Sequence, residues 1–124
     1  MPPFFQRKEQ QMEKVNPIIL RNDDGTEYKL EFTKATVKMA ERGGFTLKMI
    51  ADGKLVTGYS ELFYYAFMAN HRYMKQTDTD RILEEVGGMS DELAERLIDL
   101  YTEPAKAFSA DDEARKNSKW SVKL

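Results

Sequence analysis

The chain contains no cysteine among its 124 residues, and this absence removes several kinds of chemistry together. Without a thiol, the protein has no disulfides, no thiolate metal sites and no cysteine nucleophile. Histidine is nearly absent as well, because His71 is the only one, so a metal site with several imidazole ligands is excluded. A chain without cysteine is consistent with a reducing cytoplasm.

Long apolar runs and an excess of basic charge are also missing. No segment reaches the roughly 18 to 20 apolar residues that a membrane span requires. The first 14 residues, MPPFFQRKEQQMEK, lack the apolar stretch of a secretory signal. The formal net charge of −2 argues against a general affinity for nucleic acid, which depends on clustered lysine and arginine. We therefore expect neither a membrane nor a nucleic-acid partner.

The composition that remains is typical of one ordered domain, with 41% hydrophobic and 32% charged residues. No repeat, low-complexity tract or long linker divides the chain. We expect a mobile extension at residues 1–14, a single globular α+β domain at 15–108, and a polar tail at 109–124 that includes a short terminal strand. Met12 is a candidate start, which would make residues 1–11 an upstream extension.

The N-terminal part of the domain predicts a β-hairpin followed by two helices. Apolar residues alternate in VNPIIL and EYKLEF, and NDDG between them supplies turn residues. Thr33 is a predicted N-cap for a helix that continues to Arg42 and ends at Gly43-Gly44. Thr46 is the predicted cap of a short helix, LKMIA.

The middle of the chain holds its most apolar run, LFYYAFMANHRYM. The preceding KLVTGYS is compatible with either a loop or a brief extended segment, and Ser60 can cap the helix that follows. Because this helix is apolar on nearly all sides, we expect it to lie at the centre of the domain or to be buried by a partner.

The C-terminal part predicts two further helices and a final strand. Thr77 and Asp80 have the spacing of an N-cap and its acidic partner, and the helix they open ends at Gly87-Gly88. SDELAERLIDLYTEP predicts a helix capped by Ser90 and ended by Pro104. WSVKL alternates like a short strand, which can join the hairpin. The expected fold is thus α+β, predominantly helical, with about four to five helices.

Few residues offer catalytic or metal-binding chemistry. His71 can act as a base or a ligand, but a structural role near the end of a helix is favoured because no partner residues are recognisable. Asp78 and Asp80 have the oxygen ligands that Mg²⁺ prefers, yet acidic residues in the first turn of a helix already interact well with the helix dipole. Neither glycine pair has the spacing of a phosphate-binding loop. We expect no enzyme activity, no cofactor and no metal.

Apolar side chains of the central run are the predicted partner-binding residues. Phe63, Tyr64, Phe67 and Met68 form either the core of the domain or a face that binds another protein, and the sequence leaves both alternatives open. Methionine suits an adaptable binding face because its side chain is flexible and polarizable.

The order of several segments resembles the small tail assembly chaperones of siphophages and prophages, most closely those of phages that infect Gram-positive bacteria. These segments are FTKATVKMAERGGFTL, SELFYYAFMANHRYM, TDRILEEVGGMSDELAERLIDLYTEP and KNSKW, and the resemblance covers roughly residues 15 to 124. None of them is a catalytic signature, so the resemblance rests on the overall pattern.

The resemblance implies a protein that binds the long tape measure protein and keeps it soluble until tail tube subunits polymerise around it. Such a chaperone works in the cytoplasm of the bacterial host and is absent from the mature virion. The tail tube protein is an implied second partner, through a longer product made by a frameshift near the end of the gene. In this chain, Arg115-Lys116-Asn117 can be encoded with a run of adenines that would permit such a slip. A homo-oligomer is also among the expected partners.

Two other functions compete with this hypothesis. One is a tail-completion or structural protein that stays in the virion. The other is a small regulatory nucleic-acid-binding protein, which the acidic charge balance disfavours.

Overall fold

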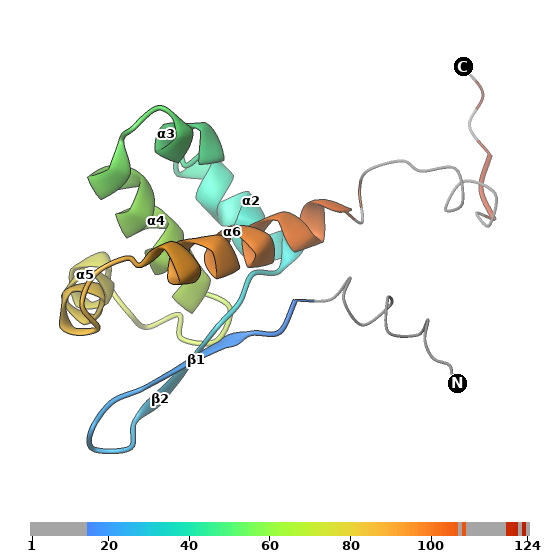
Figure 1. Cartoon of the computed structure of the whole chain (residues 1–124). Helices are drawn as coiled ribbons and strands as arrows, with labels where there is room; N and C mark the ends of the chain where they lie inside the picture. Colours follow the sequence, from blue (N-terminus) through green and yellow to red (C-terminus); the bar gives the residue numbers. More distant parts are fainter. Residues whose placement is uncertain (1–14, 107, 109–118, 122, 124) are drawn as a thin grey trace, which may run out of the picture.

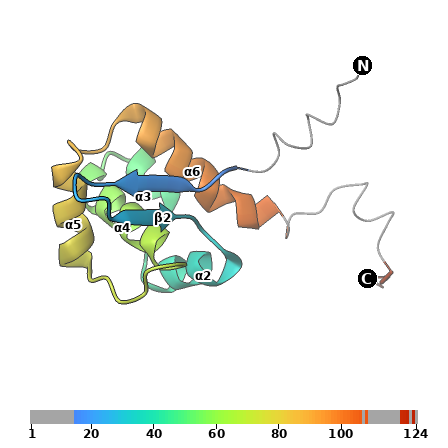
Figure 2. The same cartoon turned by 90° about the horizontal axis from the view of Figure 1, so that it is seen from below.

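The computed structural model describes residues 15–106, 108, 119–121 and 123. In these residues the chain forms one two-stranded antiparallel hairpin and five helices, which confirms the predicted α+β fold (Figure 1). The elements are β1 (Ile18–Arg21), β2 (Glu27–Leu30), α2 (Lys34–Arg42), α3 (Leu47–Ala51), α4 (Leu55–Phe67), α5 (Gln76–Glu85) and α6 (Asp91–Lys106). Figure 2 shows the hairpin crossing in front of α4, which β2 contacts.

Parts of the predicted extension and tail cannot be compared with the structure. Residues 1–14 and 109–118 lie outside the described residues, and so does the Arg115-Lys116-Asn117 segment. Residues 119–121, where we expected the final strand to begin, contain no strand. In the described part of the chain, the sheet therefore consists of β1 and β2 alone.

The hairpin forms as the alternating pattern predicted. Ile19 pairs with Lys29 and Leu20 with Tyr28, and Gly25 in the turn has a φ of +90°, which glycine adopts without steric cost. Leu30 is fully buried on the face that meets the helices, whereas Ile19 on the other face stays 54% exposed.

Helices α2 and α3 lie where the sequence placed them. Thr33 Oγ1 accepts a hydrogen bond from the Thr36 N–H at 3.2 Å, and Thr36 Oγ1 accepts one from the Thr33 N–H at 2.8 Å. This reciprocal pair satisfies two N–H groups at the start of α2. Thr46 stands at the N-cap of α3, but its side chain makes no capping hydrogen bond, so that part of the prediction was wrong.

Helix α4 begins at Leu55, five residues before the predicted cap at Ser60. KLVTGYS is therefore mostly helical, and the loop or strand interpretation was wrong. Gly58 made the pattern ambiguous, because glycine weakens a helix. The fold uses it for close packing: a Cβ at Gly58 would lie 2.8 Å from Ile50 Cγ1 of α3. The missing side chain allows α3 and α4 to approach each other.

Helix α5 has a different cap from the predicted one. Lys75 occupies the N-cap position, and its backbone N–H donates to Asp78 Oδ2 at 3.1 Å. The capping pair that we predicted, Thr77 and Asp80, is therefore wrong by two residues, and the side chain of Asp80 is available for another contact.

Helix α6 starts as predicted but ends later. Ser90 Oγ accepts a hydrogen bond from the Leu93 N–H at 3.1 Å, which confirms the cap. The helix then continues through Pro104 to Lys106, so Pro104 does not end it. Proline removes one backbone hydrogen bond there, and the last turn of this helix tolerates that loss.

The hydrophobic core surrounds α4, which contacts α2, α3, α5, α6 and β2. Tyr101 of α6 lies in this core, and its ring makes edge contacts with Phe32 and Phe45 at centroid distances of 5.1 and 5.3 Å. The buried apolar side chains of the core are those of Leu30, Phe32, Ala40, Phe45, Leu62, Phe63, Ala66, Phe67, Met68, Met74, Leu97, Leu100 and Tyr101. Among the described helices, none combines the length and apolar character that crossing a bilayer requires.

The buried phenols predict a loss of stability at alkaline pH. Burial raises the pKa of Tyr101 above its usual value of 10.0, with a further contribution from Glu41, and burial with Glu61 raises the pKa of Tyr65. The folded state thus holds these protons more tightly than the unfolded chain, so the contribution of the two phenols to the free energy of unfolding should stay constant below about pH 10 and decrease above it. Denaturant titrations across this range measure the decrease, and Tyr101→Phe should make it smaller. An equal decrease in the variant would contradict the assignment to Tyr101.

Candidate functional site

The four predicted partner-binding side chains lie mostly inside the domain. Phe63 and Phe67 are fully buried and Met68 is 3% exposed, while Tyr64 is half-buried against the core. For the three buried residues, the structure supports the core alternative. A surface that binds a partner has to be sought elsewhere on the domain.

His71 holds the hairpin against the C-terminal end of α4. Its Nε2 accepts a hydrogen bond from the Lys29 N–H at 3.0 Å, and its ring lies edge-on to Tyr28 with 5.2 Å between centroids. Asn70 Nδ2 donates to the Lys29 carbonyl at 3.2 Å, and the Glu31 N–H donates to the Ala66 carbonyl at 3.1 Å. His71 thus has the structural role that we favoured, and its partner is an N–H of β2.

The other candidates for chemistry are also accounted for by local structure. Asp78 caps α5, and Asp80 accepts a hydrogen bond from Ser60, so the two carboxylates do not converge. In the described part of the chain, no three His, Asp or Glu side chains gather as metal ligands would. The glycine pairs lie at the C-terminal ends of α2 and α5, as predicted.

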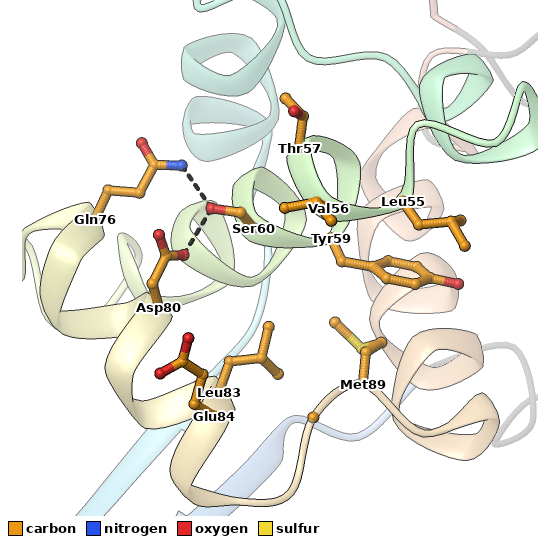
Figure 3. Close-up of a pocket in the computed structure, with 11 residues that line it drawn as sticks. Leu55, Val56, Thr57, Tyr59, Ser60, Gln76, Asp80, Leu83, Glu84 and Met89 are labelled. Carbon is orange, nitrogen blue, oxygen red and sulfur yellow. Dashed lines mark hydrogen bonds between the residues drawn. The ribbon is translucent and has the colours of Figure 1, made fainter.

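The strongest candidate site is an apolar groove of about 660 Å³ between the first half of α4 and the second half of α5 (Figure 3). Leu55, Val56 and Tyr59 of α4 form one wall, and Leu83 of α5 lies opposite them. Met89, from the connection between α5 and α6, completes the apolar lining. We call this feature the α4–α5 groove.

Two of the apolar side chains of the groove are exposed to an unusual degree. Val56 is 87% exposed and Leu55 is 47% exposed, although both lie beside other apolar residues. Scattered exposed apolar residues are normal on a protein surface, whereas apolar residues that line a groove make it a candidate binding site. No described residue covers this group.

A polar cluster forms one end of the α4–α5 groove. Ser60 Oγ donates to Asp80 Oδ1 at 2.6 Å and accepts from Gln76 Nε2 at 3.0 Å, as Figure 3 shows. These hydrogen bonds connect α4 to α5 across a separation of 20 residues between Ser60 and Asp80. They therefore set the position of the carboxylate at the rim.

A second pocket of about 520 Å³ lies between the hairpin and α5 and is more polar. Its lining mixes charges of both signs, with Arg21 and Arg81 beside Asp23 and Glu85. Arg81 lies 3.7 Å from Glu85 and 3.8 Å from Asp78, so these side chains already have partners. This pocket is a weaker candidate for a binding site than the α4–α5 groove.

The sequence contained a signal for the groove that we did not use. Leu55 and Tyr59 are separated by four residues, and they extend the helical spacing of Leu62, Phe63 and Ala66 toward the N-terminus. Gly58 and the hydroxyl residues around it obscured this continuity. That Leu55 stays exposed while Leu62 and Phe63 are buried could not be read from spacing alone.

The chain matches the model of a known protein family. A family model described as "Domain of unknown function (DUF5055)" matches residues 12–124, which is nearly the whole chain. No curated protein and no solved structure matches the chain significantly.

Removing the acceptor nitrogen of the His71 side chain should weaken the attachment of the hairpin to the helices. His71→Phe keeps a ring beside Tyr28 but leaves the Lys29 N–H without its protein partner, so the free energy of unfolding should fall by about 1 kcal/mol. Hydrogen exchange of the Lys29 amide should also become faster. Arg72→Ala, an exposed neighbour, is the control and should change neither quantity. Unchanged protection of Lys29 in His71→Phe would contradict the assigned hydrogen bond.

Ser60→Ala should destabilise the contact between α4 and α5. The variant removes the donor to Asp80, which should lower the free energy of unfolding by about 1 to 2 kcal/mol because the bond involves a carboxylate. Thr57→Ala changes an exposed residue on the same helix and should have little effect. Denaturant titration compares the two, and equal midpoints would show that the hydrogen bond does not stabilise the fold.

Proposed function

We propose that this chain, which belongs to the DUF5055 family, is a tail assembly chaperone that binds the tape measure protein of a siphophage. It keeps that long protein soluble until the tail tube polymerises, and it does so without catalysis. In this proposal it acts in the cytoplasm of the bacterial host and does not remain in the virion. A frameshifted longer form would contact the tail tube protein.

The observation that carries this proposal is the exposed α4–α5 groove. A chaperone for a long helical client needs apolar surface that is open to solvent in the free protein and can be covered on binding. Leu55 and Val56 supply such surface at the start of a helix whose later apolar residues are mostly buried. The order of sequence segments supplies the rest of the support, because it resembles the tail assembly chaperones over residues 15 to 124.

The separation of buried and exposed residues along α4 is also compatible with exchange of the client. The core residues of α4 stay inside the domain, so binding and release need no unfolding of the chaperone. Only the groove side chains and their polar rim would change their surroundings. Association without a large conformational change is common for interfaces that are already formed in the free protein.

Coexpression tests this proposal. The protein is produced together with the long product of the neighbouring tail gene, and the soluble fraction and the pulled-down complex are measured. We expect wild-type protein to keep the client soluble and retain it. Val56→Asp should lose most of the retained client, because it places a charge in the apolar groove, whereas circular dichroism should stay unchanged.

Ile19→Asp is the matched control for this experiment. Ile19 is also an exposed apolar residue, but it lies on the hairpin and does not line the groove. This variant should retain the client. A client that stays insoluble with wild-type protein would contradict the proposal, and mass spectrometry of purified virions would then test a retained tail protein.

A further inference from the structure

We infer that the α4–α5 groove binds an amphipathic helix whose apolar residues, spaced four apart, are flanked by lysine or arginine. This inference deepens the proposed function, because it defines the chemistry of the client segment. Shape and charge of the groove carry it independently of the resemblance.

The apolar wall has the dimensions of a helix surface. Leu55 and Tyr59 are themselves four residues apart on α4, so their side chains form a ridge about 6 Å long. A second helix packs on such a ridge through its own residues at positions i and i+4. Leu83 and Met89 face this ridge from α5 and from the connection to α6, and they would contact the other side of the bound helix.

The rim of the groove is acidic. Asp80 and Glu84 line it, and none of the residues that line it is lysine or arginine. The carboxylate of Glu84 forms no hydrogen bond or ion pair with any described residue, and it differs in this respect from the carboxylate of Glu85, which lies 3.7 Å from Arg81. A free carboxylate beside an apolar surface attracts a basic side chain and repels an acidic one.

The position of Asp80 strengthens this charge selectivity. Ser60 occupies Oδ1 of Asp80 through its 2.6 Å hydrogen bond. The carboxylate therefore stays at the polar end of the groove, a fixed distance from the apolar wall of α4. A bound helix can contact the apolar wall with one apolar pair and the carboxylate with one neighbouring lysine or arginine. An acidic amphipathic helix would match the wall but not the rim.

Two designed peptides test this inference with the full chain. Both are helices of about 20 residues, long enough to be helical when bound, with the same leucine pair at i and i+4. One carries lysines beside the leucines and the other carries glutamates. Fluorescence anisotropy should show that wild-type protein binds the lysine peptide about threefold to tenfold more tightly. High salt should reduce this preference, since it screens the exposed charges.

Substitutions then assign the binding to the groove. Glu84→Lys should reduce the preference for the lysine peptide or reverse it, whereas Glu85→Lys on the same helix should leave it unchanged. Val56→Asp should weaken both peptides about tenfold or more, and Ile19→Asp neither. Equal binding of the two peptides, absence of binding, or equal effects of Glu84→Lys and Glu85→Lys would overturn the inference.

The peptide and coexpression experiments test different claims, so one can fail while the other succeeds. If wild-type protein keeps the client soluble but binds both peptides equally, the inference about the groove is overturned and the chaperone function stays supported. Selective binding of the lysine peptide without any effect on the client would support the groove and overturn the chaperone function.

Discussion

The burial of α4 is the interaction on which the rest of the structure depends. Each of the other described helices contacts it, and β2 lies along its C-terminal end. Leu62, Phe63, Ala66 and Phe67 are fully buried, so α4 removes apolar surface from water on more than one side. Short helices such as α3 are marginal by themselves, and they persist here because they pack on this central element.

The two ends of α4 have different roles, and polar contacts explain the difference. At the C-terminal end, Asn70 and His71 pair with both backbone groups of Lys29 on the outer edge of β2. This edge would otherwise present unpaired N–H and C=O groups to other chains. At the N-terminal end, the hydrogen bonds of Ser60 join α4 to α5, while Leu55 and Val56 of the first turn stay exposed. One end of the helix therefore completes the fold, and the other remains available for binding.

The α4–α5 groove combines features that are unusual in the core of a protein. Two of its apolar residues are exposed, its rim is acidic, and its polar end is held by hydrogen bonds that do not depend on a ligand. A groove of this kind suits the basic amphipathic helix that we infer as its partner. The proposed chaperone function requires this separation of a stable core from an exchangeable surface.

Local sequence determined much of the fold. Alternation determined the hairpin, and Thr33 and Ser90 determined the starts of α2 and α6, because caps act within a few residues. Local sequence did not determine the start of α4, since Gly58 weakens the helical pattern. The reason for this glycine is its close packing against Ile50 of α3. Nor did local sequence determine the role of Asp80, whose partner lies 20 residues away. The tertiary structure decided which apolar residues of α4 are buried and which line the groove. Helical spacing is the same for both sets, whereas exposure depends on where the neighbouring helices end.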